Sequence, residues 1–315
     1  MLLDRAPRRV YINEVAVRDG FQSEPHFVPT DEKIRLIDGL SRTGLAKIEV
    51  TSFVSPKAIP HLRDAAEVMA GITRQPGVIY VALVPNAKGA ERALAAGANE
   101  INLVMSIGES HNLANMRMTC AQSLEQFRAV MRIVAGSPVK VNGSIATAFG
   151  CPFDGRQPLS RVLWAAESYL ALGMHGLTLA DTIGMADPVQ VESYCRGVRD
   201  AFPDVPLTVH FHNTRGMGMV NVLAALAAGV NSIDASLGGI GGCPYAPGAT
   251  GNICTEDTVH MLEACGIGTG VDLDALLALA RELPALLGHD VPGQVVHAGK
   301  STDLRQREEA ARQSA

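Results

Sequence analysis

The chain has 315 residues, of which 47% are hydrophobic and 19% are charged, as is usual for a globular protein with a sizeable core. Its formal net charge is −5 and it has no basic block, so nucleic acid is excluded as an expected partner. The N-terminus has no apolar segment of the kind found in signal peptides, and no apolar run of about 18 residues occurs, so we expect neither secretion nor a membrane span.

A short phrase recurs along the chain. In each copy a small residue and a glycine end a helical pattern, and an aliphatic residue followed by a polar one opens a strand a few residues later. The glycine suits a left-handed helix C-cap. Repetition at intervals of roughly 50 residues, or multiples of that length, predicts a repeated βα unit. The copies begin at Gly44, Gly97, Gly173 and Gly229.

Between and around these phrases, hydrophobic patterns predict alternating strands and helices. The predicted strands are Val10–Ala16, Lys47–Phe53, Val78–Pro85, Glu100–Ser106, Val139–Ala148, Gly176–Thr182, Leu207–Asn213 and Ser232–Gly238. The predicted helices begin with one capped by Thr30 and continue with His61–Ile72, Lys88–Ala96, Cys120–Ala135, Leu159–Leu172, Val189–Ala201, Met217–Ala228 and Thr255–Cys265.

Eight strands that alternate with eight helices predict an α/β fold of the TIM (β/α)8 barrel type. An open doubly wound sheet is the main alternative, but it requires a glycine fingerprint after a strand, and residues 216–221 lack the third glycine. We expect one catalytic barrel domain over residues 1–300, with an extra C-terminal helix over 272–288. The charged tail, residues 301–315, is expected to be frayed.

The polar residue of each repeated phrase should face into the barrel, because side chains alternate along a strand. These residues are Glu49, Asn102, Thr178 and Asp234. For the last three we favour structural hydrogen bonds in the interior, since most buried polar groups are structural.

The strand over 207–213 carries two histidines, His210 and His212, which alternate with apolar residues. Both imidazoles therefore share one face, about 7 Å apart along the strand. Two nitrogen ligands at the end of a strand are a common start of a divalent metal site. The alternative, two histidines that only make hydrogen bonds in a polar interior, is equally consistent with the motif alone.

The end of the first predicted strand carries Arg18 and Asp19. Their side chains are expected to point in different directions, with Asp19 supplying an oxygen ligand and Arg18 a fixed positive charge. A surface ion pair is the alternative.

The last predicted strand leads into a glycine-rich loop, residues 238–252, which can approach or cover a substrate. Cys243 lies within this loop and is a candidate for proton transfer, with an incidental exposed thiol as the alternative. The six cysteines form no Cys-x-x-Cys pair, which favours a reduced cytoplasmic protein with free thiols.

Together these segments, from about residue 10 to residue 285, resemble the hydroxymethylglutaryl-CoA lyase family, which belongs to the metal-dependent TIM-barrel lyases and Claisen-type synthases. The motifs that carry the resemblance are Val-Arg18-Asp19-Gly, Ile48-Glu49-Val-Thr-Ser52, Gly150-Cys-Pro-Phe-Asp-Gly155, Asp181-Thr-Ile-Gly184, His210-Phe-His212, and Gly-Gly-Cys243-Pro-Tyr followed by Asn252.

The resemblance implies a divalent cation, Mg²⁺ or Mn²⁺, held by Asp19, His210, His212 and Asn252. Such a cation lowers the pKa of a substrate hydroxyl. The implied reaction removes the proton of the C3 hydroxyl of an acyl-CoA, breaks the C2–C3 bond and releases acetyl-CoA. The base is either Asp19 or a hydroxide on the cation. The resemblance also suggests a homodimer.

Further roles follow from the same resemblance. Arg18 would stabilise the thioester oxygen of the enolate, and Cys243 would protonate the enolate carbon. Glu49 would orient Arg18 or the base. Gln22 and Asp181 are expected near the acyl group or beside the metal ligands.

Several positions depart from the family pattern. Phe21 stands where leucine is usual, Asn213 where aspartate is usual, and Ser144 where a tyrosine lines the acyl pocket. The segment over residues 107–112 also differs from the usual small-residue run, and we expect its His111 to be a satisfied surface histidine rather than a substrate contact. Serine in place of tyrosine removes roughly 100 Å² or more of aromatic surface. This indicates the same bond cleavage on an acyl group with a longer or more polar C3 substituent.

Three other functions compete with a lyase. A condensing Claisen-type synthase uses the same metal, but such chains usually carry an additional C-terminal regulatory domain. A barrel that binds CoA esters without turnover is the non-enzymatic possibility. A Schiff-base aldolase would need a lysine at the mouth of the barrel, and Lys47 lies at the wrong end of its strand, while nothing favours Lys140.

Overall fold

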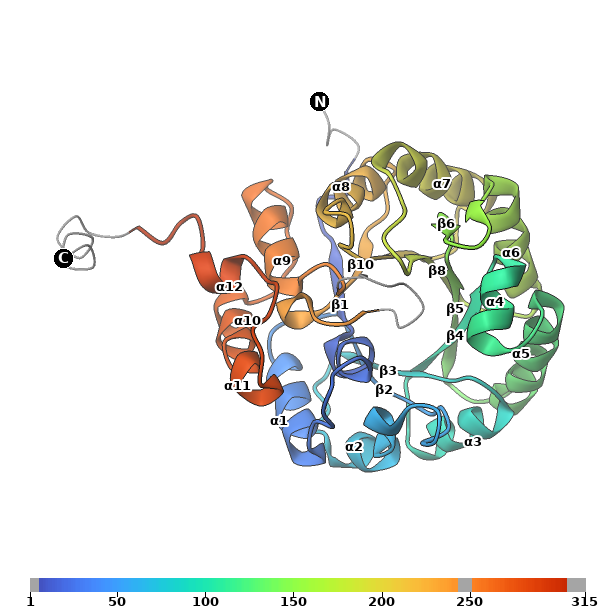
Figure 1. Ribbon diagram of the computed structural model, residues 1–315, viewed down its shortest axis with the longest axis horizontal. Coiled ribbons are helices and arrows are strands. Elements are labelled where there is room, and N and C mark those ends of the chain that lie inside the picture. Colours follow the sequence, from blue (N-terminus) through green and yellow to red (C-terminus); the bar gives the residue numbers. More distant parts are fainter. Residues whose placement is uncertain (1–5, 243–250, 305–315) are drawn as a thin grey trace.

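The computed structural model describes residues 6–242 and 251–304. Within those residues, eight parallel strands close into a barrel in the order β1-β10-β9-β8-β5-β4-β3-β2, surrounded by helices (Figure 1). The predicted TIM barrel is therefore confirmed. The barrel strands are β1 (Tyr11–Glu14), β2 (Lys47–Ser52), β3 (Ile79–Leu83), β4 (Glu100–Ser106), β5 (Lys140–Ala146), β8 (Gly176–Asp181), β9 (Leu207–Phe211) and β10 (Ser232–Ala235).

The main helices follow these strands in chain order and pack outside them. They are α1 (Thr30–Leu40), α2 (Ala65–Gly71), α3 (Ala87–Ala95), α5 (Cys120–Val134), α6 (Leu159–Ala171), α7 (Pro188–Ala201), α8 (Gly218–Ala227) and α9 (Thr255–Ala264). Three more helices, α10 (Leu273–Ala280), α11 (Leu283–Leu287) and α12 (Val295–Ala298), extend the outer layer beside α9 (Figure 1).

The apolar residues of the strands and the inner faces of the helices form one continuous core. The glycine of each repeated phrase has the predicted positive φ angle, between 72° at Gly97 and 91° at Gly173. At Gly44 a β-carbon would also lie 2.2 Å from the carbonyl oxygen of Gly270. Glycine therefore permits the left-handed turn at each of these points, and at Gly44 it also permits the close approach of Gly270.

The structure differs from the sequence-based expectation at several element boundaries. The first strand ends at Glu14, and the chain then forms one π-helical turn, η1 (Ala16–Gly20). The helix expected over 61–72 is a 3₁₀ turn, η2 (Pro60–Leu62), followed by α2. The single helix expected over 272–288 is two helices, because Pro284 cannot supply the backbone N–H that a continuous helix needs.

Besides α12, three short elements were not predicted. They are α4 (Glu109–Met116), the hairpin β6 (Gly150–Cys151) with β7 (Gly155–Arg156), and the 3₁₀ turn η3 (Leu237–Gly239). All three follow barrel strands, so they lie at the C-terminal face, where the active sites of such barrels are found.

The predicted cap of α1 is wrong. Pro29 occupies the N-cap position, and no side chain caps this helix. Thr30 instead donates a hydrogen bond to Asp64 at 2.9 Å, and the same carboxylate pairs with the buried ammonium group of Lys33 at 2.8 Å. This polar cluster joins α1 to the segment that precedes α2.

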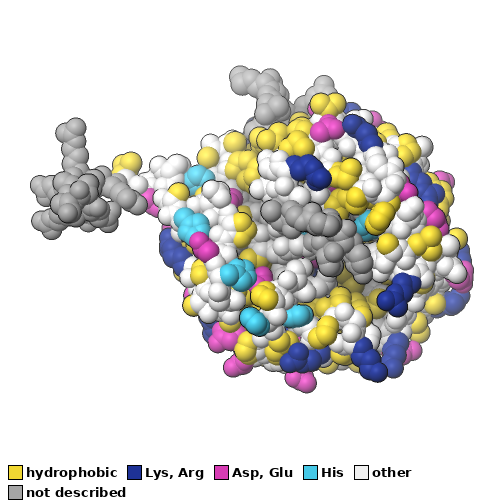
Figure 2. Space-filling view, in the orientation of Figure 1, with side chains coloured by type: hydrophobic (Ala, Val, Ile, Leu, Met, Phe, Trp, Pro, Cys, Tyr) yellow, Lys and Arg dark blue, Asp and Glu magenta, His cyan; other side chains and the backbone are white. Residues whose placement is uncertain are grey.

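No helix among the described residues is long and apolar enough to cross a membrane. On the face of the molecule that Figure 2 shows, Lys and Arg side chains are scattered rather than gathered into one basic patch. The charged tail prediction concerns mainly residues 305–315, which lie outside the described part of the chain.

Candidate metal and active site

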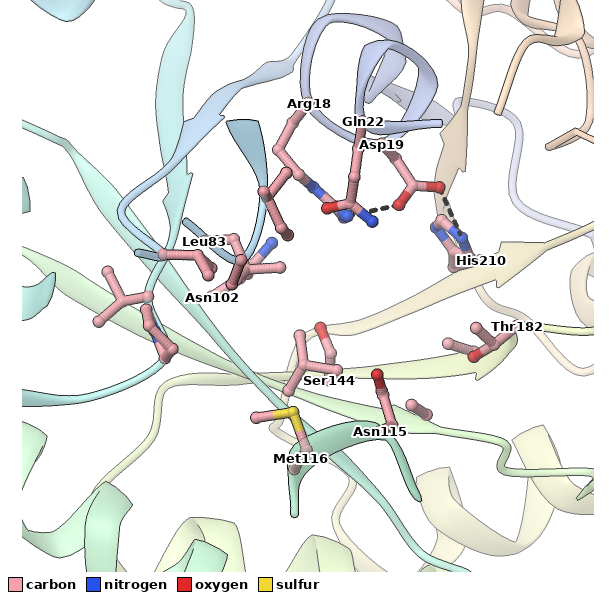
Figure 3. Close-up of a pocket in the computed structure, with 18 of the residues that line it drawn as sticks. Arg18, Asp19, Gln22, Leu83, Asn102, Asn115, Met116, Ser144, Thr182 and His210 are labelled. Carbon is pink, nitrogen blue, oxygen red and sulfur yellow. Dashed lines mark hydrogen bonds and ion pairs between the residues drawn. The ribbon is translucent and has the colours of Figure 1, made fainter. Parts of the chain in front are cut away.

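A cavity of about 570 Å³ opens at the C-terminal ends of the barrel strands. Its lining includes Arg18, Asp19, Gln22, Ser144 and His210, all of which were predicted as site residues. Figure 3 shows Arg18, Asp19 and His210 on one side of this space, with Ser144 on the other. The fold therefore gathers residues from β5, β9 and the turn after β1 around a single cavity.

The two histidines lie as the strand alternation predicts. His210 is in β9 and His212 follows its last residue, and their Nε2 atoms are 3.2 Å apart. A carboxylate oxygen of Asp19 lies 3.9 Å from Nε2 of His210 and 3.8 Å from Nε2 of His212. One ligand atom from each of the three residues lies within 4.8 Å of the others, so all three can contact one ion.

Backbone pairing places Asn252 beside the cluster of Asp19, His210 and His212. Asn252 pairs with His212 through an isolated antiparallel bridge, and Nδ2 of its amide donates to Asp19 at 2.8 Å. Its Oδ1 is buried and has no hydrogen-bond partner within the described residues. A glycine lets the loop pass here, since a β-carbon on Gly241 would lie 2.7 Å from Nδ2 of Asn252.

This donor set fits a divalent cation. Two imidazoles, a carboxylate and an amide oxygen that lacks a partner within the described residues offer mixed nitrogen and oxygen ligands, which a divalent cation can bind. Rotation of the Asn252 side-chain amide would bring Oδ1 to the place that Nδ2 occupies beside Asp19.

Arg18 does not point away from Asp19, contrary to our expectation. The two side chains form an ion pair, and both are largely buried at the cavity rather than at the surface. The guanidinium group also contacts Glu49, with 2.5 Å from both Nε and Nη2 to Oε2. Oε1 of Glu49 accepts from the amide of Asn102 at 2.9 Å. Arg18 is thus fixed by carboxylates on two sides.

Burial and charge act in opposite directions on this group of residues. Burial raises the pKa of Asp19, but the charges of Arg18, His210 and His212 outweigh it and hold that pKa well below its usual range. For Glu49, burial prevails over the Arg18 charge and raises the pKa. Burial opposes the charge of Arg18, but Asp19 and Glu49 raise its pKa, so the guanidinium group stays protonated.

Asp234 has a position that sequence reasoning did not assign. It pairs with His210 in the register of β10 and β9, and its Oδ2 lies 3.3 Å from Nδ1 of His210. Oδ1 of Asp234 accepts from the amide of Asn13 at 2.8 Å. A carboxylate behind a metal-ligating imidazole fixes the orientation of the ring. The signal was present, since both residues are polar and inward-facing on adjacent predicted strands.

The remaining predicted site residues have different positions. Asp181 does not line the cavity: it is fully buried, and its carboxylate accepts from the backbone N–H groups of Met185 and Ala186. It therefore orders the loop after β8. It also lies close enough to His210 to interact with it electrostatically, so its expected place beside the metal ligands stays a prediction. Cys243 lies outside the described residues.

A buried carboxylate at the end of β1 holds the backbone around the site in place. Glu14, at the end of β1, accepts hydrogen bonds from the backbone N–H groups of Ala16 and Leu237 and from the hydroxyl of Thr255. It thereby ties the turn that carries Arg18 and Asp19 to the elements that follow β10. Burial raises the pKa of Glu14 to about 7.

The unpredicted helix α4 also reaches the cavity. His111 lies on it, is only 1% exposed, and lines the cavity, so the expectation of a surface histidine is wrong. Its Nδ1 lies 2.9 Å from the hydroxyl of Ser106, and its Nε2 has no hydrogen-bond partner among the described residues.

Known proteins resemble this chain in sequence and in fold. A sequence model of the HMGL-like family matches residues 9–283. The chain is similar to the structure of a hydroxymethylglutaryl-CoA lyase from Acinetobacter baumannii in complex with coenzyme A and 3-methylmalate, with 56% identity, a TM-score of 0.92, and coverage of 95% of this chain and 98% of the other.

Curated relatives give the same result. A hydroxymethylglutaryl-CoA lyase of Bacillus subtilis is 43% identical over 296 residues, which cover 94% of this chain and 99% of that protein. An (R)-citramalyl-CoA lyase of Chloroflexus aurantiacus is 41% identical over 300 residues, covering 92% of this chain and 95% of that protein.

Proposed function

Because the chain belongs to the HMGL-like family, we infer that it is a carbon–carbon lyase that cleaves a 3-hydroxyacyl-CoA to acetyl-CoA and an oxo acid. The relatives described above are named as lyases for hydroxymethylglutaryl-CoA and (R)-citramalyl-CoA. They favour cleavage over the condensing reaction of a Claisen-type synthase. The observation that carries the proposal is the cluster of Asp19, His210 and His212 beside Arg18 in one cavity.

We propose that Asp19, His210, His212 and Asn252 hold a divalent cation, Mg²⁺ or Mn²⁺. The chemistry that such a cation supplies when bound is polarisation of the substrate's C3 hydroxyl. The hydroxyl proton passes to a base at the cluster, for which Asp19 and His210 are the proposed residues. The electrons of the O–H bond then form the new carbonyl at C3, and those of the C2–C3 bond pass to the leaving enolate.

Arg18 is the proposed stabiliser of this enolate. Negative charge develops on the thioester oxygen, and a fixed guanidinium group stabilises it without having to reorganise during the reaction. Glu49 serves as a positioning residue, since it contacts Nε and Nη2 of Arg18. Gln22 lies beside Arg18 at the cavity (Figure 3), where it can contact the acyl group. Cys243 is the proposed donor of the proton that C2 receives.

The small side chain of Ser144 leaves room for a substrate with a larger acyl group. This side chain lines the cavity opposite Arg18 (Figure 3). We therefore propose that the natural thioester carries a C3 substituent larger than methyl. We also propose that the protein is a homodimer and is located in the cytoplasm.

The experiment is an acetyl-CoA release assay on purified protein with hydroxymethylglutaryl-CoA and citramalyl-CoA. Activity should be lost with a chelator and restored by Mg²⁺ or Mn²⁺. Asp19→Asn should lose both cation binding and turnover, whereas the exposed Asp200→Asn should lose neither. Cation binding lost with turnover intact would contradict the proposal. Thiol release from acetyl-CoA and a 2-oxo acid, without cleavage of either thioester, would identify a synthase instead.

A further inference from the structure

The wall of the cavity opposite the cation cluster is built from α4, α5 and β5. It includes Asn115 and Met116 of α4 and Ser144 of β5, which Figure 3 shows facing Arg18, Asp19 and His210 across open space. His111 of α4 and Gln126 of α5 line the same cavity. A substrate bound at the cluster through its C3 hydroxyl would direct its C3 substituent toward one of the walls, and this wall is the one that Ser144 leaves open.

Two buried polar atoms on this wall have no hydrogen-bond partner within the described part of the chain. They are Nε2 of His111 and Oε1 of Gln126. Leaving such a group unpaired is unfavourable, and most buried polar groups in proteins have a partner. Both residues line the cavity, so a bound group can supply the partner that each atom lacks.

The His111 ring is set up for one hydrogen-bonding pattern. The Ser106 hydroxyl can donate to Nδ1 across 2.9 Å, which leaves the hydrogen of the neutral ring on Nε2. Burial lowers the pKa of His111 and so favours this neutral ring. Nε2 is then a donor, and Oε1 of Gln126 is an acceptor. A hydroxyl group matches both atoms, because its oxygen accepts and its hydrogen donates.

Charge argues against a carboxylate at this wall. Arg18 is the only Lys or Arg among the described cavity-lining residues, and it lies on the opposite side, paired with Asp19 and Glu49. Asp154 lies close enough to act on the His111 ring electrostatically. A second negative group here would be desolvated without a cationic partner, which is costly.

The rest of the wall suits a short alkyl chain. Val104, Met116 and Met118 line the cavity beside Ser144. An alkyl stem packed on these side chains would carry a terminal group beyond the position of a methyl substituent.

We propose, on the basis of the proposed lyase function, that the C3 substituent of the substrate is a hydroxyalkyl group whose terminal hydroxyl is bound by His111 and Gln126. The bond cleavage is unchanged: the hydroxyalkyl group stays on C3 and leaves with the oxo acid. His111 and Gln126 are specificity residues in this proposal and take no part in proton transfer.

The test compares three thioesters that differ only at C3. They carry methyl, n-butyl or 3-hydroxypropyl, the last two being close in size. We expect kcat/KM for the 3-hydroxypropyl substrate to exceed that for the butyl substrate by roughly 10- to 100-fold, the value of one or two uncharged hydrogen bonds. Equal values, a preference for butyl, or a preference for methyl would overturn the inference. Cleavage of none of the three would instead count against the proposed function.

Two substitutions of His111 separate substrate contact from a structural role. His111→Gln keeps a polar group near the position of Nε2, whereas His111→Asn keeps one near Nδ1, toward Ser106. We expect the ratio of kcat/KM between the 3-hydroxypropyl and n-butyl substrates to stay partly above 1 in His111→Gln and to fall to about 1 in His111→Asn and Gln126→Leu. The exposed His175→Asn, at the other end of the barrel, is the matched control. If only ordered water occupies this wall, the variants will change kcat/KM for all three substrates by the same factor, and the inference is wrong.

Discussion

Asp234 and His210 lie side by side in register on β10 and β9, and the Oδ2 atom of Asp234 is 3.3 Å from Nδ1 of His210. This contact fixes the imidazole so that its other nitrogen, Nε2, faces His212 and Asp19. A carboxylate that holds a metal ligand in this way contributes to affinity although it does not touch the metal.

Removal of that carboxylate should weaken cation binding. In Asp234→Ala the ring of His210 loses its partner, and we expect the affinity for Mn²⁺ to fall by about 10- to 100-fold. Isothermal titration calorimetry on the apoprotein measures this directly. Asp204→Ala, an exposed aspartate, is the control. An unchanged affinity in Asp234→Ala would show that the contact is only structural.

Arg18 should not be replaceable by lysine. Lysine keeps the positive charge but lacks the planar fork that contacts Glu49 and Asp19 at once. We expect Arg18→Lys to fold normally and to lose roughly 100- to 1,000-fold in kcat, as the loss of one fixed donor at a developing oxyanion costs in other enzymes. Steady-state kinetics and thermal melting separate the two effects. The exposed Arg132→Lys should behave as the unchanged protein, and full turnover by Arg18→Lys would exclude a role for the fork.

Glu14 should make the folded state less stable as the pH rises. Burial raises its pKa from 4.5 to about 7, so between these values the folded state binds more protons than the unfolded state. Its contribution to stability is therefore fully present below pH 4.5 and is lost as the pH rises through 7. The difference corresponds to about 3 kcal/mol in the free energy of unfolding.

Glu14→Gln removes this titration while keeping an oxygen for the N–H groups of Ala16 and Leu237. Urea unfolding at several pH values between 5 and 8 should show a smaller decline in the variant than in the unchanged protein. Other buried carboxyl groups contribute to the decline that persists: burial raises the pKa of Glu256 to about 7, that of Asp181 to about 6, and that of Glu49. The exposed Glu67→Gln should keep the full decline. Parallel curves for Glu14→Gln and the unchanged protein would contradict the assignment.

Much of the barrel could be predicted because local patterns determine it. The repeated glycine phrase fixes helix ends and strand starts, and the eight predicted strands lie within a few residues of those observed. The helix α4 escaped prediction because residues 109–116 are mostly polar, and its Leu113 is 47% exposed, so no apolar stripe marks it. The burial of His111 depends on that helix and on Phe153 in the hairpin of β6 and β7. The centroids of the two rings are 5.9 Å apart.

In the site, too, local patterns predicted some features, whereas others depend on distant contacts. Strand alternation was enough to place His210 and His212 on one face. It could not predict the Arg18–Asp19 ion pair, because the π-helical turn that carries both residues has no sequence pattern of its own. The position of Asn252 beside Asp19 depends on contacts between residues 233 apart, which no local pattern encodes.

That separation has a consequence for biosynthesis. The proposed ligands Asp19 and Asn252 come together only when β1 pairs with β10 and closes the seam of the cylinder. A growing polypeptide would therefore capture its cation only after nearly the whole barrel had left the ribosome. Once bound, the ion would link the segments that follow the first and last strands, and removal of the metal would lower the stability of the closed barrel.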